Sequence, residues 1–163
     1  MKKVYFVRHS IRDFTSRDDR EVPLTIEGVK LAEKLKPIFI NERIKNIYSS
    51  PYLRAIQTIK PTADILDVQI KIEEELRERE VGKWVDNFSE FSINQWHDFD
   101  FKLSNGESLN EVKQRMIKTY TKIINQEDSN IIISGHGTSL AILFNEILAG
   151  DFGLKEFNQM KMP

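Results

Sequence analysis

The sequence predicts an α/β fold of three layers, in which helices cover both faces of a largely parallel central sheet. Short apolar runs rich in β-branched and aromatic residues alternate along the chain with longer amphipathic segments, a pattern typical of such folds. Two of these runs, residues 4–7 and 131–133, each lead within a few residues to a histidine. Short, uninterrupted apolar runs of this kind are characteristic of strands that are buried on both faces.

We expect strands over residues 2–7, 44–48, 68–72 and 130–134. Residues 12–20 are polar and lack helical periodicity, which predicts a loop. Thr25 can cap a helix whose apolar positions extend to Phe39, and Pro37 is expected to kink or end that helix.

Three further helices are expected from local signals in the sequence. Ser50 is a good N-cap and Pro51 a good first helical residue, while Pro61 is expected to split the helix that they begin. Residues 108–111 form a capping box that opens an amphipathic helix, and residues 138–148 are apolar enough for a buried one.

The segment of residues 73–101 is charged first and then aromatic. It predicts a loop and a short helix that cover one end of the sheet. Since no linker or repeat divides the chain, we expect one domain over residues 1–163.

The composition is that of an ordinary globular protein, with 40% hydrophobic and 30% charged residues. A net charge of -1 provides no bulk attraction to nucleic acid or to acidic membranes, so neither is expected as a partner. The absence of cysteine excludes disulfides, cysteine-ligated zinc and a thiol nucleophile. The first apolar stretch stops at Arg8, unlike a secretory signal, and no run is long enough to span a bilayer. We therefore expect a cytoplasmic protein, either a monomer or a homodimer.

The most informative residues are His9 and His136, which follow two of the predicted strands. Because ligands bind outside the carboxyl ends of parallel strands, both histidines are expected at the same edge of the sheet. Arg8 adjoins His9, and Arg54 lies in the first turn of the helix after the second strand. Two arginines and two histidines favour an anion, and the planar guanidinium group matches phosphate oxygens. The helix N-terminus at Ser50 also favours an anion.

Imidazole can act as a nucleophile, so this set predicts phosphoryl transfer through a phosphohistidine. The leaving group then needs an acid, for which Glu78 and Glu80 are the candidates.

A metal site made of two histidines and a carboxylate is the main alternative. Because the adjacent arginines would repel a divalent cation, we predict no metal and no other cofactor. His97 is expected to have a structural or surface role.

Six motifs in this order resemble the histidine phosphatase superfamily, in its phosphoglycerate-mutase-like branch, over nearly the whole chain. The motifs occupy residues 8–10, 23–28, 49–58, 76–84, 106–108 and 134–137. The third, Ser-Ser-Pro-x-x-Arg-Ala-x-Gln-Thr, is highly specific.

The resemblance implies that His9 is the nucleophile and that Arg8, Arg54 and His136 hold the phosphoryl group. It also implies that Glu78 protonates the leaving oxygen and then activates water, and that no metal is needed. The motif makes Glu80 the poorer candidate for this acid.

The chain departs from the family pattern in several places. Ser10 stands where the family has glycine, and its hydroxyl is a candidate phosphate contact, as is Gly137. Arg12 resembles the extra arginine of members that read Arg-His-Gly-Glu-Arg and is expected to add a cation to the pocket. The alternative is that Arg12 pairs with Asp13 or Asp18. Family members continue into an asparagine turn and another strand, so we expect a shortened domain or one without its last strand.

The primary hypothesis is a metal-independent phosphomonoester phosphatase of the histidine acid phosphatase type, acting on a small phosphorylated substrate or a phosphoprotein. A phosphoglycerate mutase of the same fold is the alternative, although such mutases have longer chains with insertions that exclude water. A third hypothesis is a phospho-ligand binding domain without turnover, against which the complete set of site residues argues. Residues 11–20 and 80–101 are expected to set substrate specificity.

Overall fold

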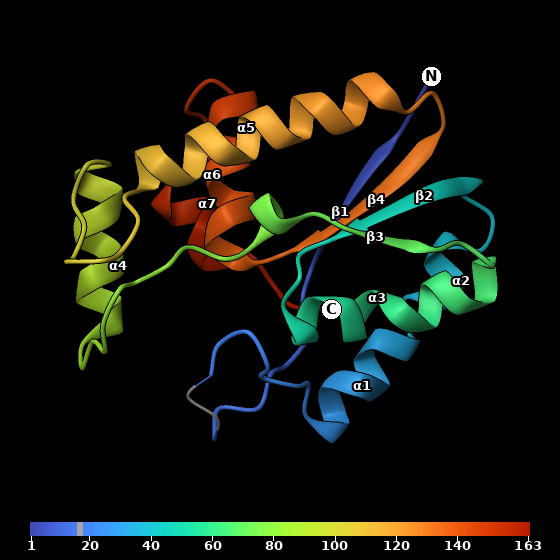
Figure 1. Cartoon of the computed structure of the whole chain (residues 1–163), viewed down its shortest axis with the longest axis horizontal. Helices are drawn as coiled ribbons and strands as arrows, with labels where there is room; N and C mark the ends of the chain where they lie inside the picture. The colour runs from blue at the N-terminus through green and yellow to red at the C-terminus, as the bar shows by residue number, and fades with distance from the viewer. Residues whose placement is uncertain (16–17) are drawn as a thin grey trace.

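The computed structural model describes residues 1–15 and 18–163. In this part of the chain, a four-stranded sheet has the order β1-β4-β2-β3, and every strand is parallel to its neighbours (Figure 1). The strands are β1 (Val4–Arg8), β2 (Ile44–Ser49), β3 (Ile70–Ile72) and β4 (Asn130–Gly135). The predicted α/β class with a parallel central sheet is confirmed.

Helices cover both faces of this sheet (Figure 1). One face carries α1 (Ile26–Glu33), α2 (Lys36–Phe39) and α3 (Leu53–Leu66). The other carries α5 (Leu109–Gln126), α6 (Gly137–Ile147) and α7 (Leu154–Gln159). The short helix α4 (Phe88–His97) lies beyond one end of the sheet, next to the beginning of α5. No described helix has the length and apolar character needed to cross a membrane.

The central strand β4 shows why its sequence is uniformly apolar. Ile131 and Ile133 pack in the core that the sheet shares with α5 and α6, whereas Ile132 packs in the core beneath α2 and α3. All three side chains are fully buried, as expected for a strand that is covered on both faces.

The strand order brings the carboxyl ends of β1, β2 and β4 together. In the parallel register, Arg8 lies beside Gly135 and Ser49 lies beside Ser134. The residues that follow these strands therefore meet at one edge of the sheet, where the candidate site forms.

Two of the predicted helix starts are confirmed. The Thr25 hydroxyl accepts a hydrogen bond from the Gly28 amide and caps α1. Ser108 and Glu111 form a capping box at the start of α5. The first helix ends at Glu33, and Pro37 lies in the first turn of the separate helix α2.

Other boundaries differ from the expectation. Tyr52, not Ser50, is the N-cap of α3, because Ser50 and Pro51 belong to the turn before the helix. Pro61 lies inside α3, which continues through it without a break. The buried residues around it hold this helix against the sheet, and such packing outweighs the cost of one missing amide donor.

The loop that follows β1 is described except at residues 16–17, so the loop prediction for residues 12–20 is tested only outside those two positions. In that loop Arg12 forms an isolated antiparallel bridge with Leu24. The third strand is shorter than expected because the Val68 amide bonds back to the Ala63 carbonyl at the end of α3. Helix α7 was not predicted.

Candidate active site

The two histidines meet at the carboxyl edge of the sheet. The His9 amide donates to the Gly135 carbonyl at 2.9 Å, which extends the pairing of β1 with β4 by one residue. The ring centroids of His9 and His136 are 5.2 Å apart. The prediction that both histidines share one edge is therefore confirmed.

His9 is held in a single tautomer. Its Nδ1 lies 2.7 Å from the Ser10 carbonyl oxygen, which can only accept, so Nδ1 carries the proton and Nε2 keeps a free lone pair. The pKa of His9 is lowered to about 4, chiefly by burial; the Ser10 carbonyl opposes this shift, and the charges of Arg54 and Arg8 add to it. At neutral pH His9 is an uncharged imidazole with an unprotonated Nε2.

His136 is fully buried beside it. Its Nε2 lies 2.7 Å from the Ser50 hydroxyl, and its ring meets the Tyr52 ring edge to face at 5.0 Å between centroids. Burial lowers the pKa of His136 well below its ordinary value, and the charge of Arg54 acts in the same direction. Its Nδ1 has no hydrogen-bond partner among the described residues.

The two predicted arginines flank these rings. Arg54, in the first turn of α3, is 2% exposed and stacks on the Tyr52 ring at 4.9 Å. Arg8 donates from Nη1 to the Met160 carbonyl at 2.9 Å. Its guanidinium group packs against Gly137, where an added Cβ would come within 3.1 Å of it. Gly137 thus provides the space that Arg8 occupies.

A carboxylate that the sequence analysis did not identify connects two of the cations. Asp19 accepts from Arg12 Nη1 at 2.6 Å, and its carboxylate lies 3.3 Å from Arg54. Arg54 also donates to the Asp19 backbone carbonyl. The expected alternatives, Asp13 and Asp18, are not the partners of Arg12 in the described residues: Asp13 accepts from the Thr15 amide and hydroxyl, and Asp18 from the Arg20 amide.

Glu78 lies at the N-terminus of α6. Its carboxylate accepts from the amides of Thr138 at 3.0 Å and Ser139 at 2.9 Å, and also from the Arg79 amide at 2.8 Å. Burial lowers the pKa of Arg8, and the negative charge of Glu78 acts on this pKa in the opposite direction. By contrast, Glu80 is exposed and lies 3.6 Å from Arg77. The structure thus places Glu78, and not Glu80, beside the other site residues.

Ser10 is fully buried, and its amide donates to the Thr58 hydroxyl at 2.9 Å. Its own hydroxyl donates to the Pro163 carbonyl at 3.3 Å.

His97 lies exposed at the end of α4, in agreement with the surface role expected for it. Within residues 1–15 and 18–163, no group of three or more histidine, cysteine or acidic side chains is arranged to hold a metal ion.

A family model, described as the histidine phosphatase superfamily (branch 1), matches residues 4–163. The chain belongs to the histidine phosphatase superfamily. A relative in Hydrogenobacter thermophilus, named "Putative phosphoserine phosphatase 2", is 27% identical over 154 residues, which cover 86% of this chain and 75% of that protein.

Three of the solved structures with a similar fold illustrate this likeness. The YhfR protein of Bacillus stearothermophilus superimposes with a TM-score of 0.81 at 20% identity, covering 99% of this chain and 86% of that one. A mutant phosphoserine phosphatase of Entamoeba histolytica in complex with phosphoserine gives 0.80 at 18% identity, with coverage of 100% and 87%. A mycobacterial glucosyl-3-phosphoglycerate phosphatase in complex with inorganic phosphate gives 0.81 at 17% identity, with coverage of 99% and 84%. At these identities the superpositions establish a shared histidine phosphatase fold.

The sequence did not reveal three residues whose side chains contact the predicted site residues. Ser50 was expected to cap a helix, yet its hydroxyl contacts His136. Tyr52 contacts the rings of His136 and Arg54, and Asp19 joins Arg12 to Arg54. The motif over residues 49–58 was the available signal for Ser50, whereas nothing distinguished Asp19 from its acidic neighbours.

Proposed function

We propose that this chain is a metal-independent phosphatase that hydrolyses small phosphate monoesters through a phosphohistidine at His9. The observation that carries the proposal is the state of His9: an uncharged imidazole, with Nε2 unprotonated, in contact with His136 and close to two guanidinium groups. A neutral ring nitrogen is the form that can attack phosphorus.

In the first step, the His9 Nε2 lone pair forms a bond to phosphorus as the bond from phosphorus to the leaving oxygen breaks. Glu78 gives its proton to that oxygen, so that an alcohol leaves. The guanidinium groups of Arg8 and Arg54 and a ring N–H of His136 stabilise the charge on the phosphoryl oxygens.

In the second step, water attacks the phosphohistidine. The Glu78 carboxylate takes a proton from the water as its oxygen bonds to phosphorus and the bond to His9 Nε2 breaks. Inorganic phosphate leaves, His9 returns to its neutral state and Glu78 is protonated again. Hydrogen bonds from the backbone amides of Arg79, Thr138 and Ser139 hold the Glu78 carboxyl group in place at the N-terminus of α6.

Buried donors support an oxyanion as the ligand. Arg8 Nε, Arg54 Nε and His136 Nδ1 are all buried without a hydrogen-bond partner among the described residues. Unpaired buried N–H groups such as those of the two arginine Nε atoms are costly, and phosphoryl oxygens would satisfy them. His136 Nδ1 is a further donor in the tautomer whose Nε2 accepts from the Ser50 hydroxyl. The same positive charges next to both histidines oppose binding of a divalent metal, which supports metal independence.

The relatives suggest which monoester to examine first. Two of the similar proteins are named phosphoserine phosphatases, and one of these is solved with phosphoserine bound. We therefore propose a small phosphorylated metabolite of this kind as the substrate, in preference to a phosphoprotein.

The test is hydrolysis of para-nitrophenyl phosphate and of phosphoserine in excess chelator, by the wild type, His9→Ala and His97→Ala. His97→Ala is the matched control because it removes an exposed histidine at the end of α4. We expect the wild type and the control to turn over, and His9→Ala to lose activity by roughly a thousandfold or more. Activity retained in His9→Ala, or activity that requires added metal, would contradict the proposal.

A further inference from the structure

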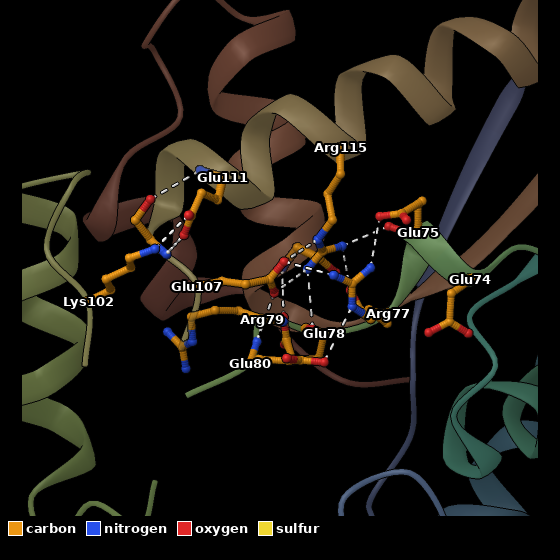
Figure 2. A network of polar contacts seen from close by, with 12 residues as sticks. Glu74, Glu75, Arg77, Glu78, Arg79, Glu80, Lys102, Glu107, Glu111 and Arg115 are labelled. Carbon is orange, nitrogen blue, oxygen red and sulfur yellow. Dashed lines mark hydrogen bonds and ion pairs between the residues drawn. The ribbon is translucent and has the colours of Figure 1, made fainter. Parts of the chain in front are cut away.

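Glu107, in the motif of residues 106–108, has no part in the steps above, yet it lies at the centre of a polar network (Figure 2). Its carboxylate accepts from Arg115 Nε at 2.8 Å and from Arg115 Nη2 at 2.9 Å, a bidentate pair. The side chains of Arg115 and Glu107 are 9% and 13% exposed. The pair is therefore largely shielded from water, and its geometry is well defined.

The same arginine also binds the backbone of the segment that carries Glu78. Arg115 Nη1 donates to the carbonyls of Glu75 at 2.7 Å and Arg77 at 3.0 Å, and Nη2 donates to the carbonyl of Glu78 itself at 3.3 Å. Figure 2 shows Arg115 extending from α5 toward these residues. One planar guanidinium group thus binds three carbonyls of the segment that ends at Glu78.

Glu107 binds the backbone of this segment just after Glu78. Its carboxylate accepts from the Glu80 amide at 2.9 Å, and its own amide donates to the Glu80 carbonyl at 2.7 Å. Residues 77–80 belong to no helix or strand. The contacts with Arg115 and Glu107 provide the backbone partners that secondary structure would otherwise supply.

A buried ion pair is weak support for stability as such, because apolar residues of similar volume often fold as well. Proton transfer, however, requires the acid within about 2.6–3.2 Å of its target, and a displacement of about 1 Å can cost roughly a hundredfold in rate. The network therefore has a clearer use in fixing the position of Glu78 than in holding the domain together.

We infer that Arg115, oriented by Glu107, is a positioning residue that sets Glu78 for proton transfer to and from the substrate. The inference rests on the proposed role of Glu78 as the acid. Arg115 acts through the Glu78 backbone, while the Glu78 carboxylate stays on the N-terminus of α6.

The experiment compares an alkyl phosphate, phosphoserine, with an aryl phosphate, para-nitrophenyl phosphate, because only the poor alkyl leaving group depends strongly on protonation. For Arg115→Met we expect kcat to fall by about a hundredfold on the alkyl ester and by less than about tenfold on the aryl ester. Glu78→Gln should show the same selectivity. In the Glu78→Gln background, Arg115→Met should add almost no further loss, since both changes act on one step.

Two further variants separate position from charge and guard against misfolding. The charge of Arg115 also contributes to the lowered pKa of His136, after burial and the charges of Arg54 and His9. Arg115→Lys keeps that charge but lacks the planar fork, so we expect it to show the same selective loss. Glu107→Gln keeps an acceptor in place and should show a smaller loss of the same selectivity, which tests the inference if Arg115→Met does not fold.

Lys122→Met is the matched control. Lys122 also projects from α5 to the segment before Glu78, but it forms an exposed pair with Glu73 at 2.7 Å. We expect this variant to hydrolyse both esters at the wild-type rate.

The outcomes distinguish the inference from the function on which it rests. Equal losses on both esters in Arg115→Met and Glu107→Gln, losses that multiply with Glu78→Gln, or full rescue by lysine would overturn the positioning role and leave the proposed phosphatase mechanism intact. Equal losses on both esters in Glu78→Gln itself would show that Glu78 is not the acid, and the inference would fail with that assignment.

Discussion

The Asp19 carboxylate pairs with Arg54, a guanidinium group that the proposed mechanism assigns to the phosphoryl oxygens. It also accepts from Arg12 at 2.6 Å. Asp19 is about half exposed, so it can move away into water. A substrate phosphate must therefore compete with a resident carboxylate, and Arg12 takes part in this competition through Asp19.

Asp19→Asn should strengthen the binding of inorganic phosphate because it removes the competing charge. We expect the inhibition constant of phosphate to fall about fivefold, in keeping with a partly exposed ion pair. Asp18→Asn is the control, since the Asp18 carboxylate accepts from the Arg20 amide instead. Unchanged or weaker phosphate inhibition in Asp19→Asn would show that the pair does not compete with phosphate.

At the scale of residues, the sequence was informative where regular structure sets the geometry. His9 and His136 were predicted to meet because each follows a strand of a parallel sheet. The acidic partner of Arg12 was not predictable, because several aspartates lie in a loop without periodicity. The tautomer of His9 likewise depends on one backbone carbonyl, which no sequence pattern indicates.

The beginning of α6 is the structural element on which the site depends most. Two of its first amides bind the Glu78 carboxylate. Its first residue, Gly137, lies against the Arg8 guanidinium group. A small residue is needed there for Arg8 to keep its place.

Gly137→Ala should weaken phosphate binding without unfolding the protein. The added Cβ would come within 3.1 Å of the Arg8 side chain, which can shift because it is the end of a flexible chain. We expect the inhibition constant of phosphate to rise by about threefold to tenfold, with little change in melting temperature because alanine favours helix more than glycine. Gly153→Ala is the control, where the new Cβ would only approach Glu156 at 3.7 Å. A large drop in melting temperature, or unaltered phosphate inhibition, would contradict this account of Gly137.

At the scale of elements, the helices with local capping signals were predicted best. Thr25 and the capping box at Ser108 mark the starts of α1 and α5 correctly. The errors at Ser50 and Pro61 arose because tertiary contacts decide both positions: Ser50 bonds to His136, and the buried face of α3 holds the helix through Pro61.

For the whole molecule, the buried histidines make stability depend on pH. His9 has a pKa of about 4 in the folded protein against an ordinary 6.5, and the pKa of His136 is also lowered, both chiefly by burial. Between these values the unfolded chain binds more protons than the folded one, so the free energy of unfolding falls as the pH drops from 6.5 toward 4. Above pH 6.5 both states are neutral and the contribution is complete.

Thermal unfolding of the wild type and His9→Ala across this pH range tests the point. We expect the melting temperature of the wild type to decrease from pH 6.5 to pH 4, and that of His9→Ala to decrease less steeply. Carboxylates with a lowered pKa, such as Glu107 beside Arg115, lose their contribution only as the pH falls below 4.5. Parallel curves for the two proteins would mean that His9 is protonated in the folded state at its ordinary pKa.

The overall architecture was predictable because the alternation of apolar runs and amphipathic segments extends over the whole chain. The strand order β1-β4-β2-β3 was not, since it depends on which strands pair across long separations. The short helix α4 beyond one end of the sheet agrees with the helix expected within residues 73–101. The presence of α7 was hidden, because it depends on packing of aromatic residues from distant segments, such as Trp96 against Phe157.

The central claim is that His9 carries the phosphoryl group during turnover. The most direct measurement is mass spectrometry of the protein quenched in alkali during hydrolysis of para-nitrophenyl phosphate, with peptide mapping of any added group. We predict one phosphoryl group, labile in acid and located on His9, in the wild type and none in His9→Ala. Rapid turnover without a covalent phosphoryl group, or a phosphoryl group on another residue, would contradict it.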